Sequence, residues 1–154
     1  MKKWFPILLV LFFVNSLCLH AQKKTSELYN LEDDVAIQGY DPVSYFNDDG
    51  PQKGKSSLTE RVDGVVYYFT NEENKVAFQQ DPDKYLPAYG GWCAYAMGAD
   101  GSKVKIDPET YKILDGKLYL FYNFYFNNTL KKWNKEEMKL KKSADAYWDE
   151  ILTN

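Results

Sequence analysis

The sequence VVYYFTNEENKVAFQQDPDKY, residues 65–85, holds a strand, a helix start and a turn in quick succession. Val65 to Phe69 is rich in β-branched and aromatic residues, which favour a strand. The next four residues, TNEE (70–73), match a capping box and predict a helix through Phe78. Asp81-Pro82 then restarts the chain for a short turn. A strand leading directly into a short helix points to an α+β arrangement.

Asp-Gly pairs, which suit tight hairpin turns, occur on both sides of this stretch. Asp63-Gly64 immediately precedes the strand, and Asp115-Gly116 lies between KIL and KLYLFY in residues 111–122. Residues 35–46 (VAIQGYDPVSYF) mix β-branched and aromatic residues on both sides of a break at Gly39 and Pro42, which predicts two short strands with a bend. Residues 47–57 (NDDGPQKGKSS) have the composition of a loop.

Helices are expected after residue 90. Gly90-Gly91 opens WCAYAMG (92–98), whose alanines favour helix. Apolar residues recur near helical spacing from Leu130 to Leu152, which predicts an amphipathic helix or a broken pair that Asn128 could cap. Asp107-Pro108 resembles a helix N-cap followed by Pro at the first position. The fold expected is α+β: short β-hairpins packed with short helices and a longer C-terminal helix.

The N-terminus has the three parts of a secretory signal peptide. Two lysines at positions 2 and 3 precede the apolar run ILLVLFFV (7–14) and a more polar end, NSLCLHA (15–21). This run is too short for a transmembrane helix, which needs roughly 20 apolar residues. We therefore predict a signal peptide at residues 1–21, an N-terminal lead-in at 22–34 and a domain at 35–152. The protein is expected to be exported, periplasmic or extracellular, with no stable membrane insertion after cleavage.

Removal of this leader changes the chemistry that is available. Cys18 and His20 leave with it, so the exported chain has one cysteine, Cys93, and no histidine. An intrachain disulfide, a Ser-His-Asp or Cys-His catalytic pair and a His-ligated zinc site are therefore excluded. The leader carries two lysines and no acid, so the net charge falls from −3 to −5, which argues against nucleic acid as a partner.

Cys93 is the most informative candidate, because it follows two glycines at the expected start of a helix. The helix dipole favours a thiolate at such a position. Met97 lies four residues on, so both sulfurs would share one helical face, and Cu(I) prefers soft ligands of this kind. Cys93 and Met97 are therefore the metal-site candidates, with copper the cofactor expected. The alternative is a buried cysteine beside a gap-filling methionine.

A second candidate is the pair Tyr40-Asp41 before Pro42. An aspartate at such a bend can accept backbone N–H bonds as an Asx-turn, which is the structural interpretation. In the functional interpretation, the Asp41 carboxylate and the Tyr40 hydroxyl lie on the wall of a ligand pocket that contains Cys93. Further tyrosines could line the same pocket: Tyr45, Tyr89 and Tyr95.

Four segments in order resemble the exported, longer relatives of the YHS-domain family: GYDPVSYF (39–46), VVYYFTNEENKVAFQQDPDKY (65–85), YGGWCAYAMG (89–98) and DGKLYLFYN (115–123). The resemblance covers about residues 35–148 and implies an α+β domain. The short YHS modules of metal-handling proteins are similar but carry three cysteines, which imply metal binding there. The matching positions here hold Ser44, Thr70 and Asn74, so that metal site is not carried over.

Three functional hypotheses follow. The first and favoured one is an exported binding protein that takes a soft metal ion such as Cu(I), or a small ligand, at a Cys93-centred site. The second is a thiol-dependent enzyme or redox protein using Cys93, which would lack a histidine base. The third is a partner-binding scaffold that uses exposed aromatics in FYNFYF (121–126). A single cysteine needs other ligands to hold a metal tightly, so a homodimer is a further alternative.

Overall fold

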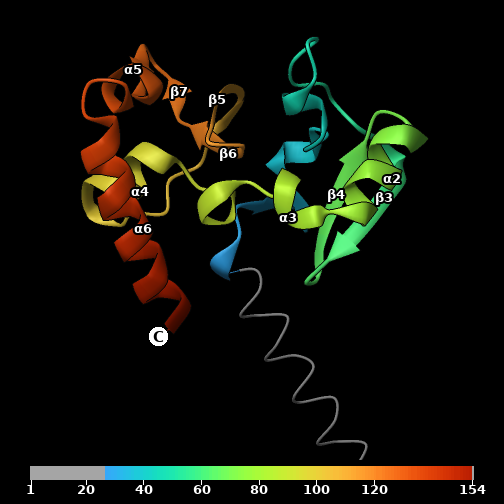
Figure 1. The fold of residues 1–154 in the computed structure, drawn as a ribbon, viewed down its shortest axis with the longest axis horizontal. Helices are drawn as coiled ribbons and strands as arrows, with labels where there is room; N and C mark the ends of the chain where they lie inside the picture. Colours follow the sequence, from blue (N-terminus) through green and yellow to red (C-terminus); the bar gives the residue numbers. More distant parts are fainter. Residues whose placement is uncertain (1–26, 154) are drawn as a thin grey trace, which may run out of the picture.

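The structure is a computed structural model that describes residues 27–153, and it confirms the α+β class (Figure 1). The predicted signal peptide, residues 1–21, lies outside the described residues. Part of the predicted lead-in joins the fold, because Leu31 and Glu32 form the short strand β1. No helix among residues 27–153 is both long and apolar enough to cross a membrane.

A four-stranded sheet forms one side of the molecule. Its order is β1 (Leu31–Glu32), β2 (Val35–Ala36), β4 (Val65–Phe69) and β3 (Lys55–Val62). The strands β2 and β4 run parallel, and the other neighbours are antiparallel. Val62 pairs with Val65, so the predicted Asp63-Gly64 hairpin is confirmed. Alternate residues of β4 are buried, as expected for a strand with one face on a core.

Two helices follow this sheet. Helix α2 (Glu72–Gln80) begins at Asn71, whose side chain accepts from the Asn74 N–H at 2.8 Å. The capping residue is therefore Asn71 and not Thr70, because the Thr70 hydroxyl is bound elsewhere. Helix α3 (Pro82–Tyr85) has Pro at its start and Asp81 as its N-cap, in agreement with the predicted turn.

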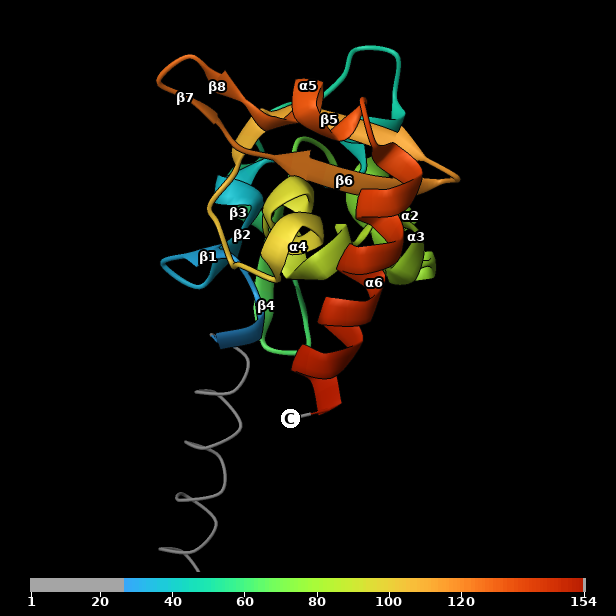
Figure 2. The ribbon, with the colours of Figure 1, turned by 90° about the vertical axis from the view of Figure 1, so that its left-hand side faces the viewer.

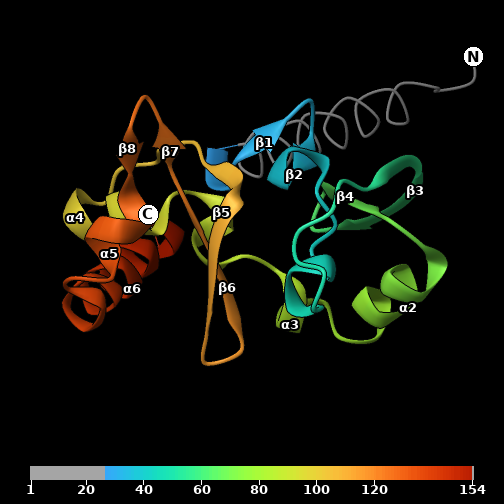
Figure 3. The same ribbon diagram turned by 90° about the horizontal axis from the view of Figure 1, so that it is seen from above.

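The hairpin of β5 (Asp107–Leu114) and β6 (Lys117–Phe121) lies between the sheet and the C-terminal helices (Figure 3). Successive residues of β6 face opposite sides. Leu118 and Leu120 belong to a first core cluster with the sheet and α2. Tyr119 and Phe121 belong to a second cluster with the C-terminal helices. The strand β6 therefore separates the two halves of the core.

The second cluster is built from three helices: α4 (Ala94–Asp100), α5 (Thr129–Trp133) and α6 (Glu137–Thr153). The predicted C-terminal helix is thus a broken pair. Asn128 caps α5 by accepting from the Lys131 N–H at 3.2 Å, as predicted. The small hairpin of β7 (Asn123–Phe124) and β8 (Asn127–Asn128) connects β6 to α5 and projects from the molecule (Figure 2).

Three sequence predictions of local structure are wrong. The predicted loop 47–57 ends at residue 54, because Lys55 begins β3. Only Val35–Ala36 forms a strand in the 35–46 segment, and two 3-10 turns, η1 (Ile37–Gly39) and η2 (Ser44–Phe46), replace the second strand. Asp107 starts β5 instead of a helix. Its carboxylate still binds locally, accepting from the Glu109 N–H and the Thr110 hydroxyl, and the pairing register shifts at this point. An Asp-Pro pair therefore marks a strand irregularity here.

Candidate functional site

Cys93 lies between the 3-10 turn η3 (Ala88–Gly91) and helix α4. Gly90 within η3 has a φ of +60°, and a side chain there would place its Cβ 2.6 Å from the Leu28 carbonyl oxygen. Only glycine fits such a close backbone approach at positive φ. The Cys93 N–H donates to the Val104 carbonyl at 2.9 Å, which ties the start of α4 to the segment that follows it.

The Cys93 side chain is completely buried and has two polar neighbours. Its Sγ accepts from the Tyr122 N–H at 3.4 Å and lies 3.4 Å from the Thr129 hydroxyl oxygen. The Thr129 hydroxyl donates its proton to the Tyr122 carbonyl at 2.9 Å. Because a hydroxyl has only one proton, Cys93 is left as the donor to Thr129. The thiol thus connects α4 to the segment between β6 and α5.

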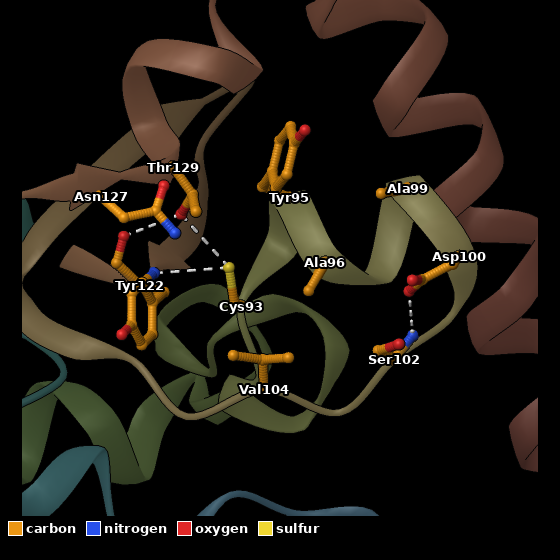
Figure 4. Close-up of a pocket in the computed structure, with 10 residues that line it drawn as sticks. All are labelled: Cys93, Tyr95, Ala96, Ala99, Asp100, Ser102, Val104, Tyr122, Asn127 and Thr129. Atoms are coloured by element: carbon orange, nitrogen blue, oxygen red, sulfur yellow. Dashed lines mark hydrogen bonds between the residues drawn. The ribbon is translucent and has the colours of Figure 1, made fainter. Parts of the chain in front are cut away.

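A cavity of about 240 Å³ lies beside this thiol (Figure 4). Helix α4 and the loop after it supply one wall, and the segment from Tyr122 to Thr129 supplies the other. The lining residues are Cys93, Tyr95, Ala96, Ala99, Asp100, Ser102, Val104, Tyr122, Asn127 and Thr129. The cavity is smaller than a drug-sized pocket, whose volume is typically about 300–1,000 Å³.

The polar groups of this cavity define what it could accept. Asp100 is the only carboxylate or basic side chain of the lining. Its Oδ1 accepts from the Ser102 N–H at 3.0 Å, and the side chain is exposed to solvent. The Asn127 side chain is also exposed to solvent and can offer an amide donor and an acceptor to a bound molecule. The rest of the wall is mostly apolar, so the cavity suits a compact apolar body with one donor group.

Met97, the other predicted metal ligand, does not line this cavity. It is fully buried in the second core cluster, whereas Cys93 belongs to the first. Within the described residues, no group of three or more histidine, cysteine, aspartate or glutamate side chains is placed to hold a metal ion. Met97 therefore packs as a core residue at the α4–α6 contact.

Asp41 is fully buried and accepts four hydrogen bonds away from this cavity. Its Oδ1 accepts from the Val43 N–H at 2.9 Å. Its Oδ2 accepts from the Thr70 N–H at 2.9 Å, the Thr70 hydroxyl at 2.8 Å and the Asn74 amide at 2.7 Å. Ser44 completes the group, because its hydroxyl donates to the Asp41 carbonyl at 2.6 Å. The side chains of Ser44, Thr70 and Asn74 thus surround Asp41, and we name this group the Asp41 cluster.

The other predicted ligand-binding tyrosines are held by separate partners. The Tyr40 hydroxyl donates to Glu109 at 2.9 Å, and the Tyr45 hydroxyl donates to the Pro108 carbonyl at 2.8 Å. Burial raises the pKa of Tyr45 well above its ordinary value, so this phenol stays neutral. The structure brings neither of them to the Cys93 cavity.

Tyr89 is likewise bound outside the cavity. Its hydroxyl donates to Asp145 on α6 at 2.8 Å. Burial, together with this hydrogen bond, raises the pKa of Tyr89 well above its ordinary value. Of the six residues predicted to bind a ligand, only Cys93 and Tyr95 line the cavity.

Sequence reasoning did not find most of the cavity wall. Ala96 and Ala99 follow Cys93 on one face of α4, a signal that helical spacing could have supplied. The segment that follows β6 in the chain supplies Tyr122, Asn127 and Thr129, and nothing in its local sequence relates these residues to Cys93. Only the tertiary fold brings these two segments together.

We expect burial to protect the Cys93 thiol from alkylation. Iodoacetamide should react at least about 100-fold more slowly with the folded protein than with the protein in concentrated urea, because reaction requires opening of the structure. Mass spectrometry over time measures both rates. In residues 22–154, the protein used for this test, Cys93 is the only cysteine, so no second thiol contributes to the measured rate. Similar rates would instead show an accessible thiol and favour the thiol-enzyme hypothesis.

Comparison with protein-family models, with curated proteins and with solved structures gives no match for this chain. The resemblance to the YHS-domain family therefore stays a prediction from the four sequence segments.

Proposed function

We propose that this chain is a small exported binding protein whose ligand occupies the Cys93 cavity. The observation that carries the proposal is a cavity of about 240 Å³ with a mainly apolar wall, two solvent-exposed polar side chains, Asp100 and Asn127, and a buried thiol in its lining. Ligand sites commonly combine an apolar wall with a few polar groups that fix orientation. Binding is favoured over catalysis because the side chain that the Cys93 thiol contacts by a hydrogen bond is the Thr129 hydroxyl, which is not a general base.

The volume and charge of the cavity define the ligand class. A water molecule takes about 30 Å³ in the liquid, so the cavity has room for a ligand of roughly one ring and a short substituent. Asp100 disfavours an anion and favours a neutral donor or a cation. We therefore propose a compact, neutral or cationic ligand with an aromatic or branched apolar body.

Three probes of one shape test this proposal: benzyl alcohol, benzylamine and benzoate. At about 0.5 kcal/mol for each of their heavy atoms, we expect the alcohol and the amine to bind with Kd of about 1 mM. Benzoate should bind at least about fivefold more weakly because of repulsion from Asp100. Calorimetric titration of residues 22–154 measures the three affinities. A preference for benzoate, or no binding by any probe, would contradict the proposal.

Two matched variants locate the binding. Ala99 is an exposed alanine of α4 in the cavity wall, and Ala146 is an exposed alanine of α6 outside it. Ala99→Leu should weaken benzyl alcohol binding at least about fivefold by filling the cavity, whereas Ala146→Leu should leave it unchanged. Equal affinities in the two variants would place the binding elsewhere. A Cu(I) titration beside Cys93→Ser tests the metal alternative on the same protein.

A further inference from the structure

The β7–β8 hairpin has an unusual turn. Phe124 pairs with Asn127, so the loop between the strands consists of Tyr125 and Phe126 alone. Both residues have positive φ, +52° and +63°, as in a type I′ turn. Asn-Gly is the preferred sequence of such a turn, because bulky residues rarely adopt the left-handed conformation. Two consecutive aromatic residues are therefore a strained choice at this position.

The aromatic side chains of this turn gain no packing inside the fold in return. The exposed fraction is 92% for Tyr125 and 111% for Phe126, and Phe124 beside them is 42% exposed. Figures 2 and 3 show the hairpin projecting beyond the rest of the chain. We name Phe124–Phe126 the aromatic tip. Phe124 packs edge-on against Tyr122, with 5.1 Å between the ring centroids, whereas Tyr125 and Phe126 strain the turn and remain in solvent. The strained, exposed pair indicates a contact outside this chain.

The sequence segment that carries the aromatic tip is basic. Residues 116–135 contain four lysines and no acidic residue, in a chain of net charge −3. Helix α5 follows β8 directly and lies at the same end of the molecule (Figures 1 and 2). Its Lys131 and the following Lys135 are exposed and make no salt bridge within the described residues. Two acids lie at the base of the hairpin: Asp107 accepts from Asn123 at 3.3 Å, and Asp100 lines the same cavity as Asn127.

We infer that the aromatic tip docks on the surface of an anionic lipid bilayer. Tyrosine suits the interface because its ring is apolar and its hydroxyl is polar, and phenylalanine can enter the acyl boundary. Lys131 and Lys135 would then meet the anionic headgroups beside the tip. An apolar insertion combined with basic contacts is the pairing that gives stable peripheral attachment. Charge complementarity favours this occupant over an apolar pocket in another protein.

Vesicle sedimentation tests the inference on residues 22–154, which contain every helix and strand that the structure describes. We expect binding to vesicles of phosphatidylcholine and phosphatidylglycerol at 7:3, weaker binding to phosphatidylcholine alone, and a decrease with salt. Tyr125→Asn combined with Phe126→Gly should reduce binding at least about tenfold. Val76, an exposed apolar residue of α2, is the matched control: Val76→Gln should not change binding.

The same double variant separates docking from a structural role. Asn-Gly fits the turn without strain, so the thermal midpoint should rise by about 3 °C or more while vesicle binding is lost. Replacement of Lys131 and Lys135 by Gln should weaken binding to the anionic vesicles at least about threefold with no loss of stability. A double variant that is less stable than the wild type would overturn the inference. So would vesicle binding that survives the substitution, or a wild type that binds no vesicles and captures a protein through the tip instead.

Discussion

Replacing Asp41 by alanine is expected to lower the free energy of unfolding by about 4 kcal/mol. The carboxylate accepts from the Val43 N–H, the Thr70 N–H, the Thr70 hydroxyl and the Asn74 amide, and it is fully buried. Alanine would leave the Val43 N–H, the Thr70 N–H and the Thr70 hydroxyl without their acceptor, whereas the Asn74 amide would keep its bond to the Thr70 oxygen. Because small domains are stable by only about 5–15 kcal/mol, this loss is a large fraction of the total.

Urea unfolding followed by circular dichroism measures this change. Asp41→Asn keeps the shape and one acceptor oxygen, so it should lower the free energy of unfolding by about 2 kcal/mol and remain folded. The exposed Asp49, in the loop before β3, is the control, and Asp49→Ala should change stability by less than about 0.5 kcal/mol. If Asp41→Ala were as mild as Asp49→Ala, the Asp41 cluster would not be a structural element.

Replacing Gly98 by alanine is the second large prediction, with an expected loss of about 3 kcal/mol. An added Cβ at this α4 position would lie 2.4 Å from the Leu140 carbonyl oxygen and 3.1 Å from the Leu140 Cβ on α6. The first of these atoms is backbone, so a side-chain rotation cannot relieve the clash. Helix α4 would have to move away from α6.

The direction of the change in stability distinguishes a packing clash from helix propensity. Helix propensity alone predicts that Gly98→Ala stabilises the protein by about 1 kcal/mol. Gly116, at the tip of the β5–β6 hairpin, has nothing within 4 Å of an added Cβ but has a φ of +74°. Gly116→Ala should therefore cost only about 1 kcal/mol, through backbone strain. Thermal unfolding compares the two variants, and a stabilising Gly98→Ala would mean that α4 and α6 are not in contact there.

Local signals in the sequence were sufficient to predict several turns and one helix cap. The Asp-Gly pairs at 63–64 and 115–116 each occupy a hairpin turn, and Asn128 caps α5. These features depend on backbone geometry within a few residues, which is why sequence reasoning found them. The prediction of a helix start at Asp107-Pro108 was wrong for the opposite reason. Asp107 pairs with Phe121 of β6, and this long-range contact places it in a strand.

In the candidate site, too, local features were predicted from the sequence and long-range contacts were not. Cys93 and Tyr95 were predicted as ligand-binding residues. The cavity is also lined by Asn127 and Thr129, which come close to them only because the chain returns to α4 after β6. Asp41 was identified as a residue of interest, and its Asx-turn contact to Val43 was foreseen. Its contacts with Thr70 and Asn74 could not be, because they join segments that lie about thirty residues apart in the chain.

The most direct test of the proposed binding function is a proton–nitrogen NMR titration of residues 22–154 with benzyl alcohol. The proposal predicts saturable shifts concentrated in the amides of the cavity wall, above all Ala96, Ala99 and Tyr122. These shifts should disappear in Ala99→Leu and persist in Ala146→Leu. Shifts centred on the Asp41 cluster or the aromatic tip, or no shifts at concentrations well above the expected Kd, would contradict it.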